Sequence, residues 1–326
     1  MIDLSTLVKS TEAYNVINRD KEQGRLSHAY LVLCSDGANL GAYLKEIAKL
    51  LLCPFGACQT CTTCSRIENG VFPDVEFLPK EGESVTSEEV NELIAESYVK
   101  PYEGDKKVFV ISQAQSMNLA SQNKLLKTLE EPPKNVHIIL GATSEFSILP
   151  TVRSRVKKLV ISPFTKSVLE KTLASECLDK ERLADAIACG DGTLGKTLAL
   201  YNDENLQQVM DLAKDILVNM QSSKEVLEYS DKITSSKTDL TQLIEVLSLF
   251  VRDMLVSYEN RPSVAFNQKV TESLLQAKGY TKGALINILE DLVGAIKRVG
   301  ANGNKTMVQD WLLFKILEDK FKWQKL

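Results

Sequence analysis

Four cysteines within a twelve-residue stretch carry the strongest chemical signal of this chain. Cys53, Cys58, Cys61 and Cys64 are spaced C-x4-C-x2-C-x2-C. Thiolates are soft ligands, and four of them suit the tetrahedral coordination of zinc. A metal with four protein ligands has no open coordination position, so such a site is structural and not catalytic. An iron–sulfur cluster with a different usual spacing and ordinary free thiols are the other interpretations. We expect a structural Zn²⁺ ion.

Two arginines separated by one serine, Arg153 and Arg155, offer a second kind of chemistry. A guanidinium can stabilise the charge of a phosphoryl group that is transferred in a neighbouring subunit. A nucleoside triphosphatase also needs acidic residues after a buried strand to hold magnesium. Here the apolar run Val108–Ile111 is followed by the uncharged Ser112 and Gln113. The chain therefore has an arginine suited to binding a phosphate but lacks the carboxylates that would hold magnesium for ATP hydrolysis.

The loop after the first expected strand is a degenerate phosphate-binding loop. A working loop reads G-x-x-x-x-G-K-[ST], in which the lysine reaches the phosphates and the hydroxyl holds magnesium. Leu40 falls at the lysine and has no charge, Gly41 falls at the hydroxyl and has no side-chain oxygen, and Asp36 adds a negative charge. We therefore expect no ATP bound by this chain, although helix N–H groups could hold an anion weakly. The degenerate positions are Cys34, Gly37, Asn39, Leu40 and Gly41.

The composition is typical of a globular protein with more than one domain. Of its 326 residues, 44% are hydrophobic and 25% are charged, and the net charge is −4. This balance excludes a polycation, so contact with nucleic acid would need local patches or partners. The first ten residues lack the pattern of a signal peptide, and no segment approaches a membrane span of ~20 apolar residues. We expect a cytoplasmic protein, in which Cys34, Cys177 and Cys189 are packing thiols.

The first half alternates short apolar runs with helical patterns, which predicts a parallel sheet covered by helices. Asn118 can cap a helix, and Pro132 ends it because proline disfavours helical geometry in the preceding residue. This order of strands and helices, with right-handed crossovers, predicts an α/β domain like those of P-loop NTPases. The expected strands are residues 29–33, 107–111, 136–140 and 158–161.

The strand signals stop after Pro163, and helical patterns follow. Short helices broken at Gly190–Gly192 suggest a small helical lid domain. From Leu206 onward, long amphipathic helices with 3.6-residue periodicity predict an all-α domain. We therefore predict three domains, with boundaries at residues 1–162, 163–204 and 205–326.

Several stretches resemble one known family. They are the segment LSHAYL at residues 26–31, the peptide NKLLKTLEEPP at residues 123–133, the four-cysteine insertion and Arg153-Ser-Arg155. Together they resemble the delta-prime subunits of bacterial DNA polymerase III clamp loaders, which belong to the AAA+ superfamily. The resemblance covers residues 1–200 well and the remainder by helical character. It implies an AAA+ α/β domain with a four-cysteine zinc module at residues 53–64, a lid and a C-terminal helical collar.

The resemblance also implies a function at a subunit interface. Clamp loaders are pentameric rings in which ATP is bound by one subunit and completed by an arginine of the next. Arg155 falls on the family's Ser-Arg-Cys motif, with Val156 replacing the cysteine, which implies an arginine finger acting in trans. The alternative is an ion pair between Arg155 and a carboxylate at a domain edge, and for Arg153 both interpretations stay open. The implied partners are gamma/tau motor subunits, a delta subunit, the sliding clamp and primer-template DNA, at a nucleoid-associated replisome.

Two departures from the family pattern affect these expectations. The first cysteine gap is shorter than is common in related proteins, which makes Cys53 the least secure ligand. Gly195 stands where catalytic relatives place a nucleotide-sensing arginine, which supports a subunit without ATPase activity. Glu130 and Glu131 end a helix before two prolines and are expected to be structural.

Three functions remain after this reading. The leading one is a non-ATPase clamp-loader subunit that donates Arg155 to a neighbouring motor subunit. The second is a motor ATPase of the gamma/tau type, which requires that Leu40 and Gly41 be tolerated in a divergent loop. The third is a zinc-dependent DNA-binding module, against which stand the acidic balance and the lack of a basic stripe around the cysteines.

Overall fold

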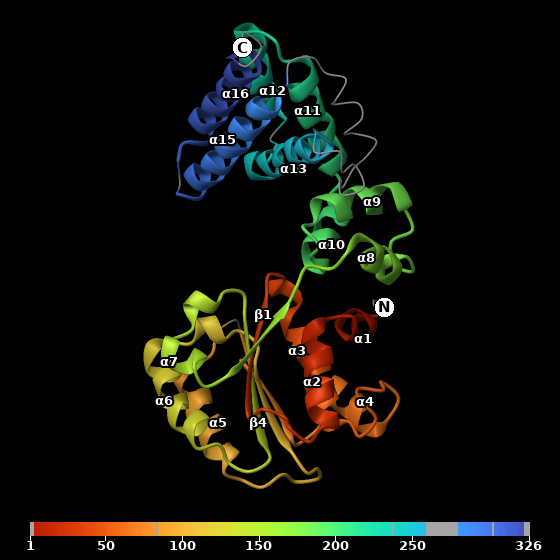
Figure 1. Ribbon diagram of the computed structural model, residues 1–326, viewed down its shortest axis with the longest axis vertical. Helices are drawn as coiled ribbons and strands as arrows, with labels where there is room; N and C mark the ends of the chain where they lie inside the picture. Colours follow the sequence, from red (N-terminus) through yellow and green to blue (C-terminus); the bar gives the residue numbers. More distant parts are fainter. Residues whose placement is uncertain (1–2, 83, 237, 259–279, 302, 323–326) are drawn as a thin grey trace. The chain divides into compact units, whose positions relative to one another are not determined.

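A computed structural model of the chain is shown in Figure 1. Among the residues that it describes, no helix is both long and apolar enough to cross a membrane. The described residues are 3–82, 84–236, 238–258, 280–301 and 303–322.

The chain divides into two compact units. The first consists of Met1–Lys180 and Gly190–Lys196, and the second of Glu181–Cys189 and Thr197–Leu326. The three domains with boundaries at residues 1–162, 163–204 and 205–326 remain a prediction.

The first unit contains a five-stranded sheet in the order β2-β3-β4-β1-β5, and each neighbouring pair is parallel. Because the neighbouring strands run parallel, even those that are consecutive in sequence need crossover connections, which the helices supply. The arrangement confirms the predicted P-loop NTPase-like (AAA+) α/β fold. The edge strand β2 was not predicted, because it has only four residues, three of them half-buried. The strands are β1 (Ala29–Cys34), β2 (Val75–Leu78), β3 (Lys107–Ile111), β4 (Val136–Ala142) and β5 (Lys157–Ile161).

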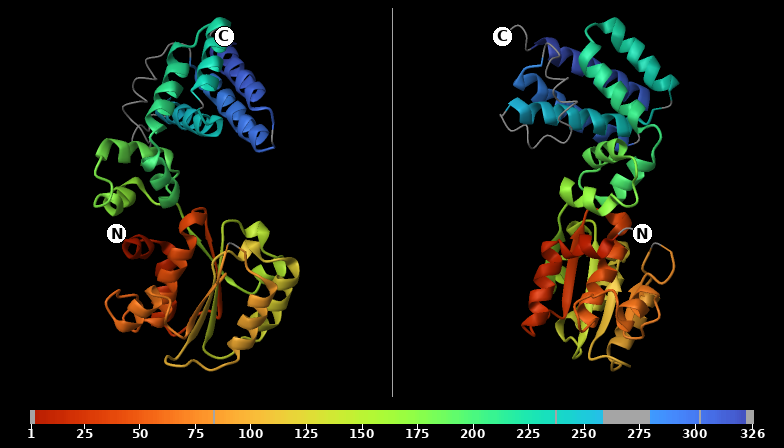
Figure 2. Two further views of the ribbon diagram at one scale, coloured as in Figure 1. Left: turned by 180° about the vertical axis from the view of Figure 1, so that it is seen from behind. Right: turned by 90° about the vertical axis from the view of Figure 1, so that its right-hand side faces the viewer.

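Helices cover both faces of this sheet. Helices α1 to α4 lie on one face, and α5 to α7 lie on the other (Figures 1 and 2). Strands β3 and β4 are buried along their whole length, as a central position between two helical layers requires. The helices of this unit are α1 (Leu4–Lys9), α2 (Glu12–Glu22), α3 (Gly37–Leu52), α4 (Thr62–Glu68), α5 (Ser87–Ser97), η1 (Ala114–Ser116), α6 (Leu119–Glu130), η2 (Glu145–Ser147), α7 (Pro150–Arg153) and α8 (Lys166–Leu173).

Helix α6 begins and ends where the sequence predicts. The side chain of Asn118 accepts a hydrogen bond of 2.8 Å from the backbone N–H of Ser121, which caps the helix. The last helical residue is Glu130, two positions before Pro132. The helix follows β3 and precedes β4, so its end lies at the edge of the sheet where the parallel strands begin.

Within its described residues the second unit contains helices and connecting loops but no strand, which confirms the predicted all-α character of the C-terminal part. Its core is made mainly of apolar side chains from α11, α12, α13, α15 and α16, with a smaller part from α9 and α10. A buried Lys320 ties two of these helices together, because its Nζ donates to the carbonyl oxygens of Leu217 and Met220 at 3.2 and 3.1 Å. The remaining helices are α9 (Lys180–Cys189), α10 (Leu194–Asn202), α11 (Leu206–Asn219), α12 (Ser223–Ser235), α13 (Leu240–Tyr258), α15 (Lys282–Gly300) and α16 (Lys305–Lys322).

Candidate functional site

The degenerate phosphate loop lies at the edge of the sheet where the parallel strands end. The loop joins β1 to α3, and Ser112 follows β3 at the same edge. A Cβ atom added to Gly41 would lie 3.7 Å from the Cβ atom of Ser112. Gly41 and Ser112, which belong to the two predicted parts of a degenerate nucleotide site, are therefore neighbours in space.

A carboxylate of the chain itself fills this loop. Asp36 is only 5% exposed, and its Oδ2 accepts hydrogen bonds from the Tyr43 hydroxyl at 2.8 Å and from the Gly195 backbone N–H at 3.0 Å. The Asn39 amide donates to the same oxygen at 3.1 Å. Burial, and then the nearby Asp36 carboxylate, raise the pKa of Tyr43 far above its usual range, so its hydroxyl remains a donor. Asp36, which the sequence suggested only as an unhelpful charge, is thus the centre of a closed hydrogen-bond network.

Gly195 leaves room for this network. A Cβ atom at this position would lie 2.7 Å from Asp36 Oδ1 and 3.0 Å from the amide nitrogen of Asn39. An arginine, which the resemblance places here in catalytic subunits, has no space unless Asp36 moves. The absence of a side chain at Gly195 and the closure of the loop by Asp36 are therefore linked.

Ser112 and Gln113 serve the backbone of the sheet edge. The backbone N–H and the hydroxyl of Ser112 both donate to the carbonyl oxygen of Leu78, at 2.9 and 3.0 Å. Gln113 precedes the short helix η1 and is half-buried. Ser112 is thus used to join the ends of β2 and β3.

Arg155 lies at the opposite edge of the sheet, two residues before β5. Its Nη2 forms an ion pair of 2.5 Å with Glu130 Oε1 at the end of α6. Its Nη1 donates to the Thr151 carbonyl oxygen at 2.8 Å and to the Ser154 hydroxyl at 3.2 Å. The side chain is still 34% exposed. The alternative interpretation, an ion pair with a carboxylate, is therefore present within this chain, and the finger remains a prediction.

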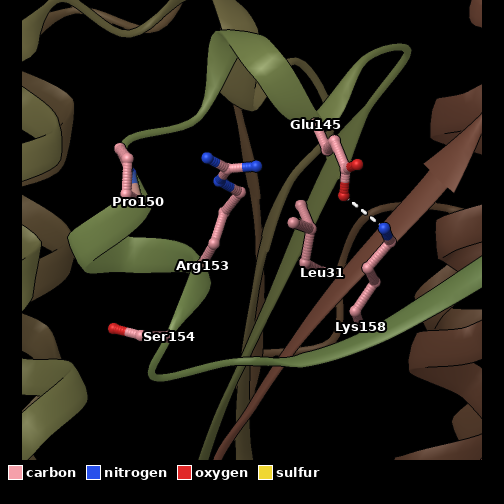
Figure 3. Close-up of a pocket in the computed structure, with 6 residues that line it drawn as sticks. All are labelled: Leu31, Glu145, Pro150, Arg153, Ser154 and Lys158. Atoms are coloured by element: carbon pink, nitrogen blue, oxygen red, sulfur yellow. Dashed lines mark hydrogen bonds and ion pairs between the residues drawn. The ribbon is translucent and has the colours of Figure 1, made fainter.

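Arg153 points away from these partners. It lines a cavity of about 280 Å³ on the α7 side of β1 and β5, and Figure 3 shows that no ion pair joins its guanidinium to the other five residues drawn there. On the other side of the cavity Lys158 forms an ion pair with Glu145. The two arginines therefore have different surroundings, although one residue separates them. The cavity is lined by Leu31, Glu145, Pro150, Arg153, Ser154 and Lys158.

Gln122 positions the segment that carries both arginines, and sequence reasoning missed it. This side chain is 2% exposed. Its amide nitrogen donates to the carbonyl oxygen of Ser147, and its amide oxygen accepts from the backbone N–H of Leu149, at 3.2 and 2.8 Å. A polar residue that shares a helical face with Leu125 and Leu129 was the available signal.

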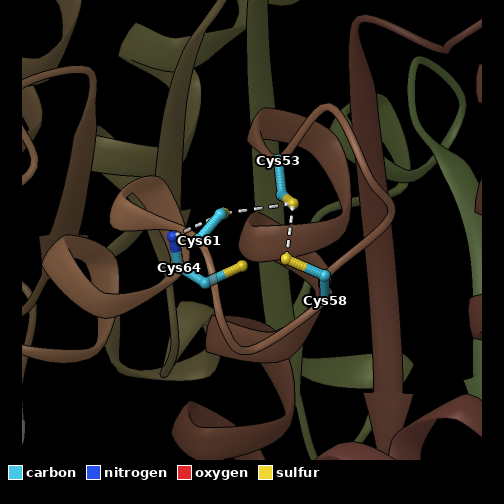
Figure 4. Close-up of side chains that lie close together, drawn as sticks. All are labelled: Cys53, Cys58, Cys61 and Cys64. Atoms are coloured by element: carbon cyan, nitrogen blue, oxygen red, sulfur yellow. Dashed lines mark hydrogen bonds between the residues drawn. The ribbon is translucent and has the colours of Figure 1, made fainter.

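The four cysteines converge as the spacing predicts, and this includes Cys53 (Figure 4). All four Sγ atoms lie within 4.8 Å of one another. Cys53 Sγ lies 3.7 Å from that of Cys58 and 3.6 Å from that of Cys61. Zinc with Zn–S bonds of about 2.3 Å in a tetrahedron separates its sulfur ligands by about 3.8 Å. The cluster is therefore within metal-binding distance and compatible with zinc.

An iron–sulfur cluster fits this spacing less well, because iron and sulfide atoms would stand between the thiolates and separate them further.

The cysteines of the cluster differ in how readily they lose a proton. Hydrogen bonds from the backbone and hydroxyl of Thr60 lower the pKa of Cys58 to about 6, which favours its thiolate. A thiolate is the form that a metal requires. Burial raises the pKa of Cys64, so that cysteine would lose its proton on metal binding.

The cysteine loop adopts a backbone that needs support. Gly56, Ala57 and Gln59 have φ values of 69°, 52° and 65°. The left-handed region costs a residue with a side chain on the order of 1 kcal/mol. Contacts with the N-terminal helices offset this cost: the Tyr14 hydroxyl donates to the Gly56 carbonyl oxygen at 3.1 Å, and the Gln59 amide donates to the Ser5 hydroxyl at 3.0 Å. The loop therefore holds its cysteines together through the surrounding fold.

Comparisons with known proteins find similarity to subunits of DNA polymerase III. A family model described as "DNA polymerase III, delta subunit" matches residues 9–165, which include the cysteine cluster and both arginines. The chain is 26% identical to DNA polymerase III subunit delta' of Bacillus subtilis over 94% of each protein. It is 27% identical to DNA polymerase III subunit gamma of Buchnera aphidicola from Schizaphis graminum, over 90% of this chain and 82% of that protein. It is 29% identical to subunit delta' of Escherichia coli, over 57% of this chain and 58% of that protein.

Proposed function

Because the chain belongs to the family of DNA polymerase III clamp-loader subunits that includes delta-prime and gamma/tau, we propose that it is the non-ATPase subunit of such a clamp loader. In this role it supports the loading of a sliding clamp onto primed DNA during replication. It works in the cytoplasm at the replisome, beside gamma/tau motor subunits and a delta subunit in a hetero-pentamer. It contacts primer-template DNA mainly through the assembly.

The observation that carries this proposal is the closed phosphate loop. Asp36 accepts three hydrogen bonds at the position where a bound triphosphate would have to accept them from the protein. Leu40 and Gly41 cannot replace the lysine and the hydroxyl, and Ser112 offers no carboxylate for magnesium. The chain therefore has no means of holding ATP for hydrolysis.

Arg155 then serves a neighbour and not its own loop. It precedes β5, whereas the phosphate loop follows β1, and in a parallel sheet these points lie at opposite edges. Glu130 and the Thr151 carbonyl oxygen hold the guanidinium in place while part of it faces solvent. An arginine finger that is held ready in this way can stabilise the charge of a γ-phosphate in trans.

The four cysteines hold a structural zinc ion in this proposal. No coordination position would remain open, so the metal would fix the segment between α3 and α4 without taking part in catalysis.

An exposed apolar face on α16 supports the proposal that the chain assembles with partner subunits. Three apolar side chains with seven-residue spacing lie on this face of the helix. They are Met307, Phe314 and Phe321, which are 70%, 42% and 39% exposed.

Reconstitution with gamma/tau and delta subunits tests the proposal. We expect the purified chain to join the complex, and the DNA-stimulated ATPase activity of the complex to fall when this chain is omitted. The isolated chain should bind no ATP in a direct titration. The second candidate is a gamma/tau-type motor ATPase, because the chain is also similar to a gamma subunit. Tight ATP binding by the isolated chain would favour this candidate.

A further inference from the structure

Arg153 has an unmet need for a hydrogen-bond acceptor. Its Nε atom is buried, and it has no hydrogen-bond partner among the described residues. Buried polar atoms are nearly always paired, and a buried donor without a partner costs about 1–3 kcal/mol. The cost is higher for a charged group. Because Arg153 also lines a cavity, a group that enters this cavity can approach its guanidinium and supply an acceptor.

The cavity beside Arg153 has the size and charge for a small anion. Lys158 and Glu145 neutralise each other on its far wall, and the hydrogen bond from Lys158 lowers the pKa of Glu145. Arg153 also lowers this pKa through its charge, so two cations share one carboxylate and one positive charge is left over at the cavity. Its volume of about 280 Å³ is below the roughly 300–1,000 Å³ of pockets that hold whole small molecules. One carboxylate matches the single excess positive charge, whereas a triphosphate carries more negative charge than one guanidinium can balance.

Arg155 does not share this need. Its charge is balanced by Glu130, and its Nη1 has two further acceptors. The two guanidiniums therefore have different surroundings, since among the described residues only that of Arg155 has hydrogen-bond acceptors around it. One of the two arginines is free to serve a different purpose from catalysis.

An exposed aromatic ring identifies the source of the anion as a protein. Phe146 is 86% exposed and directly follows Glu145 in the cavity wall. Arginine and aromatic side chains are enriched in the centres of protein interfaces, where they make the strongest contacts. A free metabolite would have no use for the ring outside the cavity.

We propose that the cavity beside Arg153 is an anchor point for an aspartate or glutamate side chain of the neighbouring subunit. Arg153 donates to the carboxylate, in the planar geometry that arginine favours, and Phe146 packs against the same partner. The inference rests on the proposed function in one respect only, which is that the neighbour is a motor subunit. It assigns the affinity of the interface to Arg153 and the turnover of ATP to Arg155.

The affinity of the full chain for the gamma/tau motor subunit tests this anchor. Arg153→Ala should raise the Kd at least tenfold, because the partner carboxylate would lose a desolvated charged donor. The Kd of Arg153→Lys should lie between those of the wild-type chain and Arg153→Ala, because lysine keeps the charge but cannot make two parallel hydrogen bonds. The exposed Arg25 is the matched control, since Arg25→Ala removes the same charge elsewhere and should leave the Kd within twofold. An unchanged Kd for Arg153→Ala, with an unchanged melting temperature, overturns the proposal.

A second measurement needs no partner and identifies the anion. In the full chain labelled with ¹⁵N, we expect acetate to shift the Nε–H resonance of Arg153 and inorganic phosphate to shift it less. A larger response to phosphate, or no response to either anion, overturns the assignment to a carboxylate. If this resonance responds but the chain does not bind the motor subunit, the proposed function fails and the anion site stands. If Arg153→Ala binds normally while Arg155→Ala lowers turnover, the anchor fails and the finger stands.

Discussion

Replacing Asp36 with alanine should destabilise the first unit strongly, because this carboxylate is the common acceptor of its closed phosphate loop. The change removes the acceptor of the Tyr43 hydroxyl, the Asn39 amide and the Gly195 N–H. Tyr43 is fully buried, so its hydroxyl would lose its partner without gaining bulk water. Asn39 is half-buried and can turn toward solvent. The loss is thus concentrated in two of the three donors.

The size of the effect follows from these burials. A buried donor without a partner costs about 1–3 kcal/mol, and a hydrogen bond to a charged group is worth about 1.5–3 kcal/mol. Two such losses, with some relief from water entering the vacated space, give about 3 kcal/mol. For a unit of this size, about 3 kcal/mol lowers the melting temperature by roughly 6–12 °C.

Differential scanning calorimetry measures this shift, and the chain offers two controls. Tyr43→Phe removes one donor and leaves Asp36 with its other partners, so it should cost about half as much. Both tryptophans, Trp311 and Trp323, belong to the second unit. Their fluorescence should report an unchanged transition in that unit. An Asp36→Ala protein whose first unit melts at the wild-type temperature would refute the reasoning, as would a larger loss in Tyr43→Phe.

Two further predictions concern the metal and the pH dependence. Cys61→Ser should lower the zinc content from one ion per chain to well below one after dialysis, whereas Cys34→Ser, outside the cluster, should keep the ion; elemental analysis decides, and equal zinc in both proteins would contradict the site. Burial lowers the pKa of His137 below its usual 6.5, so the unfolded chain takes up this proton first and the fold loses stability as the pH falls below 6.5. His137→Gln should flatten the dependence of the melting temperature on pH between pH 7 and pH 5, and an unchanged slope would contradict this.

The sheet and the helix boundaries could be predicted because their signals are local. The apolar runs of β3 and β4 are long enough to stand out. Asn118 marks the start of α6 through its side-chain cap, and Pro132 marks its end through its backbone. Strand β2 was not predicted, because it has only four residues at the sheet edge and lacks a continuous buried run. The convergence of four cysteines was also local, since only eleven positions separate the first from the last.

The contacts that close the loop could not be predicted, because they join residues far apart in the sequence. Asp36 and Gly195 are separated by 159 positions in the sequence. No local sequence pattern around either residue predicts contact with the other. The different surroundings of Arg153 and Arg155 depend on how α7 turns into β5. Gln122 was visible as a polar residue on an apolar helical face, but its partners at Ser147 and Leu149 were not.

Pre-steady-state ATP hydrolysis by the reconstituted clamp loader on primed DNA tests the central claim most directly. With Arg155→Ala in this subunit, the ATP site that adjoins it should slow by about 10³ or more, as when other arginine fingers are removed. The burst should therefore fall by one ATP per complex while assembly is kept. A burst of unchanged size and rate in the assembled Arg155→Ala complex would contradict the account.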